Sequence, residues 1–439
     1  MWWRRWLSSS EWAGRPVWLW IALAGLLAHL AYIGITWAFS PVPRWWAAPE
    51  DSPGYISAAR SILHGRYETV PGDPRFRYFR SPGYPALLAF VALITGGDPG
   101  GWTIVFAHAL LAALWCGLNY ALARRLGIEP EVAALAGIAV VFYPTALALT
   151  PVILTDLPAA VALTVSLWFL VTGLQSSRLR MVIVAGLFAG WAILMRPAAQ
   201  VVLLVWPVVG WLWPNRGNFG WRGVTVLVLS SAAIPALWMA HVHSEIGLWM
   251  MNTHTSHHLY AGTCSGVIVR GVPNLHARLE NETRRHEFEE VVPGFRTERE
   301  RVLWEKAQAD SIIRVNLDGV LPYLVRTTAL FLLSPTKEYY AQFPPSKAHG
   351  SSVLLKLLSL TQLALVVWGM VAFARERRWR VVAVLLVVLG GVVGVSLMAG
   401  AMAGIRLLLP AALTYVIAGA KGVLSLYRHV VRLVEARPR

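Results

Sequence analysis

Three arginines stand beside turn-forming residues at the ends of apolar segments. Arg80 directly precedes Ser81-Pro82-Gly83-Tyr84-Pro85, Arg196 lies in Met195-Arg196-Pro197, and Arg406 follows Gly404-Ile405. Fixed cations at the depth of the lipid headgroups suit recognition of a lipid phosphate, because a guanidinium binds phosphate through two hydrogen bonds and stays charged. The alternative is that each side chain extends to ordinary lipid headgroups.

Two aspartates lie at the same predicted membrane boundary as these arginines. Asp51 precedes Ser52-Pro53, and Asp156 lies in Thr155-Asp156-Leu157-Pro158. An ionised carboxylate near hydrocarbon is costly, so such a residue usually has a function. The alternative for each aspartate is simple capping of the helix that starts beside it, because Asp is preferred at helix starts and Pro in the first turn.

Histidines and cysteines give no metal or disulfide pattern. The spacing of the histidines matches no compact zinc site, so we expect them to be surface or hydrogen-bonding residues and predict no metal ligand. Cys116 lies in an apolar run and Cys264 in a hydrophilic segment, so the two are not expected to pair. The clustered histidines are His241, His243, His254, His257 and His258.

The composition predicts that lipid is the solvent of this chain. Of its 439 residues, 56% are hydrophobic and only 14% are charged, and the mean hydropathy is +0.53. This is more apolar surface than one soluble core could bury. The formal net charge of +16 does not indicate nucleic-acid binding, because most arginines sit in short clusters between apolar runs.

We predict an all-α polytopic bundle of about ten or more transmembrane helices. The first, Val17 to Phe39, is too long for a signal-peptide core and is expected to be an uncleaved signal anchor. Some of the other segments are short for a straight span. The ten apolar segments are residues 17–39, 102–123, 131–149, 158–174, 181–195, 198–213, 223–242, 353–374, 381–400 and 405–426.

With the N-terminus in the cytoplasm, the arginine clusters between spans all fall on the cytoplasmic side, as the positive-inside rule expects. These clusters are Arg124/Arg125, Arg178/Arg180, Arg216/Arg222, Arg375/Arg377/Arg378/Arg380 and Arg428/Arg432. Three regions then share the opposite face: residues 40–101, the turn from Thr150 to Asp156, and the hydrophilic segment 243–350.

The outer loop is unusual because it is rich in arginine where positive charge is normally sparse. We expect a short amphipathic surface helix over Pro53 to Leu63, and a juxtamembrane or re-entrant helix over residues 85–95, which are too few to span comfortably. The arginines of the first part of the loop are Arg44, Arg60, Arg66, Arg75, Arg77 and Arg80.

Motifs along most of the chain resemble the GT-C glycosyltransferases, specifically the protein-mannosyltransferase-like and aminoarabinose-transferase-like group of bacterial membrane enzymes (family 39-type). The order and spacing of the motifs carry this resemblance more than any single motif does. The matching segments are Asp51-Ser-Pro-Gly-Tyr55 with Ala58/Ala59 and Gly65, Arg80-Ser-Pro-Gly-Tyr-Pro85, Leu154-Thr-Asp156, Gly186-Leu-Phe-Ala-Gly190 through Arg196-Pro197, and Arg406-Leu-Leu-Leu-Pro410.

The resemblance implies an inverting transfer of a sugar from a polyprenyl-phosphate donor to an acceptor hydroxyl on the extracytoplasmic face. Asp51 corresponds to the catalytic base and Asp156 to the second loop carboxylate. Arg80, Arg196 and Arg406 would hold the donor phosphate, and Tyr55, Tyr84, His257 and His258 would line the substrate pocket. A divalent metal is possible but not predicted, because Ser52 stands where the family often has a second acid.

We expect three parts: an N-terminal transmembrane module over residues 1–242, an extracytoplasmic segment with juxtamembrane helices over 243–350, and C-terminal transmembrane helices with a basic cytoplasmic tail over 351–439. The expected location is the bacterial inner (plasma) membrane, and the expected partners are the lipid-linked donor, a protein, lipid or polysaccharide acceptor, and membrane lipids, but not nucleic acid. Alternatives are a transporter or flippase of a lipid-linked glycan, or a non-catalytic GT-C relative.

Overall fold

The computed structural model describes residues 11–12, 15–39, 51–213, 220–264, 267, 294–333, 349–399 and 412–435. Arg44 and Arg406 lie outside these residues. The described part of the chain is almost entirely helical, apart from a two-stranded antiparallel pairing of β1 (Glu11–Trp12) with β2 (Arg15–Pro16) next to the first long helix. The chain is therefore an all-α membrane protein.

Each of the ten apolar segments of the sequence falls on a helix, although the stretch 405–411 of the last segment lies outside the described residues. The helices are α2 (Val17–Phe39), α5 (Trp102–Arg125), α6 (Pro130–Val141) with α7 (Pro144–Leu149), α8 (Asp156–Ser176), α9 (Leu179–Met195), η1 (Pro197–Val201) with α10 (Val202–Leu212), α11 (Gly220–Ile246), α18 (His349–Arg375), α19 (Trp379–Ala399) and α20 (Ala412–Glu435).

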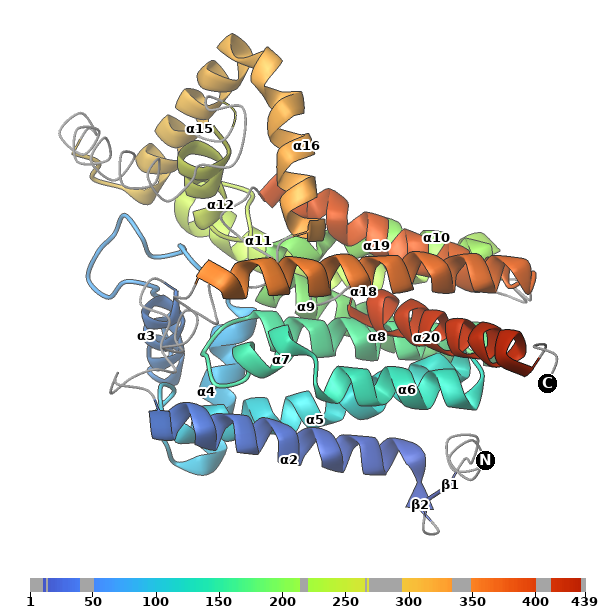
Figure 1. Ribbon diagram of the computed structural model, residues 1–439. Coiled ribbons are helices and arrows are strands. Elements are labelled where there is room, and N and C mark those ends of the chain that lie inside the picture. The colour runs from blue at the N-terminus through green and yellow to red at the C-terminus, as the bar shows by residue number, and fades with distance from the viewer. Residues whose placement is uncertain are drawn as a thin grey trace.

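Five segments among the described residues are long and apolar enough to cross a membrane, namely Val17–Ala38, Trp102–Arg125, Pro130–Leu149, Asp156–Ser176 and Gly220–Ile246. Several others, such as Leu179–Met195 and Pro197–Leu212, are apolar but shorter. The long helices lie side by side in Figure 1, and the start of α2 and the end of α20 are at the same end of the bundle.

Small residues let neighbouring helices approach closely, as is common where lipid supplies no hydrophobic driving force between helices. Gly190 of α9 faces α11, where an added Cβ would lie 2.7 Å from the backbone oxygen of Ser231. The largest buried apolar cluster is formed by α5, α6, α8 and α9, with contributions from α19 and α20. This packed core is the frame on which the loops at the two ends of the bundle rest.

The turns predicted to be cytoplasmic meet at one end of the bundle. Lys421 of α20 donates hydrogen bonds to Glu129, before α6, at 2.9 Å and to Glu376, after α18, at 2.7 Å. Arg378, before α19, forms an ion pair with Glu129 at 3.2 Å. Charge thus joins α20 to two helix–helix connections, the one between α5 and α6 and the one between α18 and α19, in agreement with the alternation of the predicted spans.

The opposite end carries the short helices and the hydrophilic segment. The expected surface helix is α3 (Ser52–Leu63), and residues 85–95 belong to α4 (Gly83–Thr95); both lie at this end of the bundle in Figure 1. Beyond α11 follow α12 (His254–His257), the π-helix η2 (His258–Thr263), α15 (Glu298–Val315) and α16 (Leu317–Leu333). Figure 1 shows α15 and α16 standing together to one side of the long helices.

Candidate active site

Two aspartate–arginine ion pairs lie at the end of the bundle that carries α3. The Arg80 Nη2 donates to Asp51 Oδ1 at 2.8 Å, and the Arg196 Nη1 donates to Asp156 Oδ1. Asp51 is the more accessible carboxylate, with 25% of its side chain exposed against 2% for Asp156. Neither aspartate uses its side chain to cap a helix, and Arg80 is buried against protein, so the capping and headgroup interpretations do not describe these residues.

Two local contacts explain why these residues meet. The hydroxyl of Ser52, at the start of α3, donates to the carbonyl of Ile153 at 2.9 Å, which fastens Asp51 beside the loop that leads to Asp156. Gly83, at the start of α4, lies against the end of α9, where an added Cβ would be 2.6 Å from the backbone nitrogen of Met195. The Ser-Pro-Gly turn after Arg80 therefore reaches the residue before Arg196.

Tyr55 lies beside both ion pairs. The guanidinium carbon of Arg80 is 5.0 Å from the centre of the Tyr55 ring. Burial raises the pKa of the Tyr55 phenol, and the charges of Arg80, Asp51, Arg196 and Asp156 all act on it. Since the phenol stays protonated at neutral pH, it can donate a hydrogen bond to a substrate oxygen at this site.

Tyr84 is placed behind Tyr55 and away from solvent. It is fully buried, and its ring meets the ring of Tyr55 edge-on at 5.2 Å. Its hydroxyl is 3.0 Å from Nε2 of His108, whose Nδ1 is 3.2 Å from the carbonyl of Thr150. A carbonyl only accepts, so Nδ1 carries the proton and Nε2 accepts from Tyr84. The structure thus gives Tyr84 a supporting position.

The loop before Asp156 is held by two histidines that we did not select from the sequence. In addition to His108 of α5, His29 of α2 lies with Nδ1 2.6 Å from the hydroxyl oxygen of Thr150. Both histidines are buried within apolar helices. A polar residue inside a membrane helix is itself a signal, because it is costly there without a partner.

Comparisons with known proteins agree with this architecture. The family model for dolichyl-phosphate-mannose-protein mannosyltransferases matches residues 79–240. An oligosaccharyltransferase of Archaeoglobus fulgidus tethered to an acceptor peptide has a TM-score of 0.55 at 13% identity, over 96% of this chain and 52% of that one. AglB from the same organism, in complex with an inhibitory peptide and a dolichol-phosphate, has a TM-score of 0.53 at 15% identity, over the same shares.

The chain therefore shares the fold of these membrane oligosaccharyltransferases, and its residues 79–240 are similar to the mannosyltransferase family. It spans about half the length of the oligosaccharyltransferases that it resembles. No curated protein matches its sequence.

The loop that carries Arg80 is held from several sides. The backbone N–H of Arg80 donates to the hydroxyl of Thr69 at 3.1 Å, and the backbone carbonyl of Arg80 accepts from the Tyr67 hydroxyl at 2.5 Å. The guanidinium carbon lies 5.2 Å from the centre of the Phe79 ring. The Nε atom of Arg80 is buried and has no hydrogen-bond partner within the described part of the chain.

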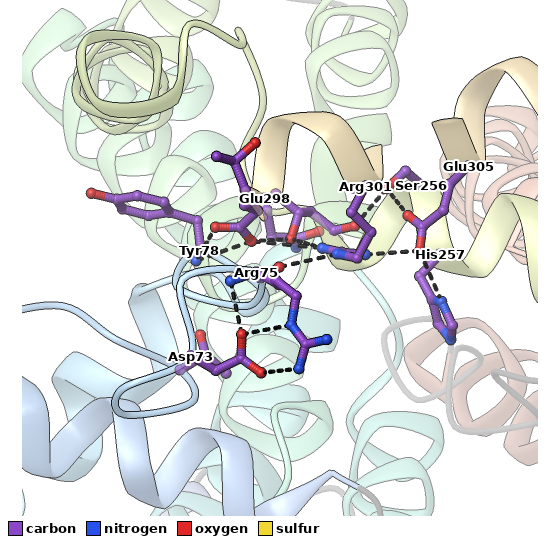
Figure 2. A network of polar contacts seen from close by, with 12 residues as sticks. Asp73, Arg75, Tyr78, Ser256, His257, Glu298, Arg301 and Glu305 are labelled. Atoms are coloured by element: carbon purple, nitrogen blue, oxygen red, sulfur yellow. Dashed lines mark hydrogen bonds and ion pairs between the residues drawn. The ribbon is translucent and has the colours of Figure 1, made fainter. Parts of the chain in front are cut away.

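A buried charge network joins α15 to this loop (Figure 2). Glu298 accepts from the backbone N–H of Tyr78 at 2.9 Å, and Arg301 donates to the carbonyl of Arg75 at 3.0 Å and to Glu305 at 2.8 Å. The hydroxyl of Thr253 lies between Glu298 and Arg301. Glu298, Arg301 and Glu305 are each at least 95% buried. This network was not predicted.

Burial raises the pKa of Glu298, and hydrogen bonds from Thr253 and Tyr78 oppose the shift. Burial also acts on Glu305, but hydrogen bonds from His257 and Ser256 and the charge of Arg301 together hold the pKa of Glu305 below its usual range. Glu305 is therefore ionised at neutral pH.

Other arginines of the predicted outer loop are also paired with carboxylates. Arg60 contacts Asp98 at 2.9 Å, Arg75 contacts Asp73 at 2.8 Å, and Arg77 contacts Glu245 at 3.0 Å. The positive charge of the predicted outer loop is thus largely balanced within the protein. Arg75 lowers the pKa of Asp73 through its hydrogen bond.

His254 and the two predicted pocket histidines lie beside this loop. The His254 ring is 4.5 Å from the ring of Phe79 and 4.0 Å from that of His258, and His257 Nδ1 is 3.2 Å from Glu305. No three His, Cys, Asp or Glu side chains are arranged to hold a metal ion within the residues that the structure describes. Burial lowers the pKa of His254 far below its ordinary value, so this imidazole is neutral.

Proposed function

We propose that this chain is an inverting glycosyltransferase that moves a sugar from a polyprenyl-phosphate donor to an acceptor hydroxyl on the extracytoplasmic face of the membrane. The observation that carries the proposal is the meeting of two aspartates and two arginines around Tyr55 at one end of a GT-C bundle. The match to the mannosyltransferase model over residues 79–240 supports it, because that stretch includes three of the four charged residues.

Asp51 is the proposed catalytic base. A hydroxyl is a poor nucleophile until a positioned carboxylate takes its proton, which contributes roughly 10²- to 10⁴-fold to the rate. Asp51 is one-quarter exposed, whereas Asp156 is enclosed, so only Asp51 is open to an incoming acceptor. Asp156 then positions Arg196.

Arg80 and Arg196 are proposed to bind the donor phosphate. The carrier phosphate departs without a proton, so the reaction needs positive charge near the leaving group and no general acid. The Nε of Arg80 is the best available donor, since it is buried without a partner among the described residues. The structural neighbour AglB was solved in complex with a dolichol-phosphate, and this ligand supports the proposal that a lipid phosphate binds at Arg80 and Arg196. The third proposed arginine, Arg406, lies outside the described residues.

The proposal routes no step through a metal, because each aspartate already accepts from an arginine. The proposed location is the inner membrane, with the site on the extracytoplasmic side. This orientation follows from the arginine-rich turns at the opposite end of the bundle.

The deciding experiment is transfer of radiolabelled sugar from a panel of synthetic polyprenyl-phosphate sugars to an envelope extract. Purified wild type is compared with Asp51→Asn, which we expect to keep its fold and donor binding but to lose turnover by at least about a hundredfold. Asp98→Asn is the matched control, since Asp98 also pairs with an arginine of the outer loop but is half exposed.

Transfer by wild type and by Asp98→Asn, but not by Asp51→Asn, supports the proposal. Near-normal turnover of Asp51→Asn removes Asp51 from its role. If the folded wild type binds a donor but transfers no sugar from any donor of the panel, a lipid-glycan transporter or a non-catalytic relative becomes the better description.

A further inference from the structure

His257 is the part of the buried charge network that reaches solvent. Its side chain is 34% exposed, whereas the side chain of its partner Glu305 is only 6% exposed. Figure 2 shows the imidazole beyond the carboxylate of Glu305, turned away from Arg301 and Glu298. A side chain used only to fill the network would be expected to be enclosed by it.

The hydrogen bonds of Glu305 fix the protonation of the imidazole. Glu305 accepts from His257 Nδ1 at 3.2 Å, from Arg301 at 2.8 Å and from the Ser256 hydroxyl at 2.7 Å. An ionised carboxylate only accepts, so Nδ1 of His257 carries the proton. In the neutral form of an imidazole with its proton on Nδ1, the acceptor lone pair is at Nε2, on the far side of the ring from Glu305.

The surroundings place the His257 ring close to the proposed donor site. The His257 ring is 6.1 Å from the ring of Phe79, and the same Phe79 ring is 5.2 Å from the guanidinium carbon of Arg80. His257 is the last residue of α12 and directly precedes the π-helical turn η2, and such turns are frequent at functional sites. One aromatic ring thus contacts both the partly exposed histidine and the buried Arg80.

We propose that His257 is an acceptor-binding residue whose Nε2 accepts a hydrogen bond from a hydroxyl of the acceptor substrate, with Glu305 as its positioning residue. This inference rests on the proposed glycosyltransferase function and deepens it. A hydroxyl-bearing acceptor fits because it can donate to Nε2, whereas an ionised phosphate oxygen cannot. The hydroxyls of the donor sugar can also donate, so the separate KM values for acceptor and donor distinguish the two substrates.

Two substitutions separate the roles of the two ring nitrogens. In His257→Asn, the side-chain amide can still donate to Glu305 but has no atom at the position of Nε2. In His257→Gln, the amide reaches the position of Nε2 and does not titrate. His243→Asn is the control, because His243 is exposed and stacks only on Trp249 among the ring contacts.

The measurement is the apparent KM for a dilution series of envelope extract, together with the KM for the lipid-phosphate donor. His257→Asn should raise the acceptor KM about three- to tenfold, as expected for loss of one hydrogen bond, and leave the donor KM and thermal stability unchanged. His257→Gln should keep the acceptor KM close to that of the wild type, because its amide oxygen can accept a hydrogen bond at the position of Nε2.

An unchanged acceptor KM in active His257→Asn overturns the inference and leaves the proposed function intact. Equal loss of donor affinity, acceptor affinity and stability also overturns it, because the residue would then only support the network. If wild type transfers no sugar at all, the proposed function fails and this inference fails with it.

Discussion

At the scale of single residues, the guanidinium of Arg80 has more donors than the protein uses. Its Nη2 donates to Asp51, its ring neighbours are Tyr55 and Phe79, and its Nε is buried with no partner in the part of the chain that the structure describes. A buried donor without an acceptor costs about 1–3 kcal/mol. A phosphate oxygen of a substrate would relieve this cost.

Arg80→Ala should weaken donor binding by at least about tenfold, since hydrogen bonds to charged groups contribute about 1.5–3 kcal/mol. Arg80→Lys should recover only part of the loss, because an ammonium lacks the fork of two N–H groups. Binding of radiolabelled polyprenyl-phosphate sugar to the purified proteins measures the donor affinity of both variants. Arg60→Ala, in the same loop, is the control, and we expect little change because its ion pair is exposed. Unchanged affinity of Arg80→Ala would favour a purely structural arginine.

The four central residues could be predicted from the sequence, but their pairing could not. Asp51, Arg80, Asp156 and Arg196 stand out because charges at membrane boundaries are rare. Their pairing depends on the hydrogen bond from Ser52 to Ile153 and on the close approach of Gly83 to Met195, which no spacing rule encodes. His108 and His29 were missed because one histidine in an apolar helix forms no motif.

At the scale of elements, α15 is attached to the outer loop through charge. Glu298 and Arg301 bind the backbone of residues 75–78, immediately before Arg80, while the ring of Phe76 lies 4.7 Å from the guanidinium carbon of Arg301. The helix begins with a capping box between Thr297 and Glu300. The sequence contains this capping pattern, but the burial of three charged side chains of one helix cannot be predicted from a segment that is hydrophilic throughout.

Glu298→Ala should release α15 from the loop, because it leaves the N–H of Tyr78 and the hydroxyl of Thr253 buried without their acceptor, while Arg301 keeps Glu305. Each buried donor left without an acceptor costs about 1–3 kcal/mol. Hydrogen–deuterium exchange should show lost protection across Glu298–Val315, and donor affinity should fall with it. Lys306→Ala, on an exposed position of the same helix, should leave exchange unchanged. Full protection in Glu298→Ala would mean that apolar packing alone holds α15.

At the scale of the whole molecule, one lysine joins the C-terminal helices to the N-terminal part of the bundle. Lys421 is 2% exposed and contacts Glu129 and Glu376, and its Nζ lies 5.1 Å from the centre of the Phe373 ring. The apolar segments were correctly predicted to be helical because their apolar character is encoded locally. The contact of Lys421 was not predicted, because it joins α20 to two helix–helix connections, and one of its partners, Glu129, lies 292 residues away in the sequence.

Lys421→Ala should destabilise the bundle by at most about 1.5–3 kcal/mol, the contribution of hydrogen bonds to charged groups, because the partly exposed Glu129 and Glu376 keep Arg378 as a partner. Thermal unfolding of the purified protein in detergent measures the effect. Arg432→Ala, on an exposed position of the same helix, should change stability by less than about 0.5 kcal/mol. Equal stability of both variants would assign the docking of α20 to close helix packing alone.

The proposed orientation predicts which turns an impermeant maleimide reaches in intact cells. Val70→Cys, in the exposed outer loop, should be labelled, whereas Ser176→Cys, at the end of α8, should react only after the membrane is permeabilised. The native Cys116 and Cys264 are buried and should give little background. The reverse labelling pattern would invert the topology and place the paired aspartates and arginines in the cytoplasm.

The contact between Asp51 and Arg80 also imposes an order of events on catalysis. While the carboxylate accepts from the guanidinium, each group masks the other: the aspartate is a weaker base and the arginine a weaker anion binder. A donor phosphate that draws Arg80 toward itself unmasks Asp51 in the same movement. The Asp51 carboxylate would then become a stronger base only when a donor sugar is bound, so donor binding would activate the base. Deprotonation of an acceptor hydroxyl at a site without donor would be suppressed.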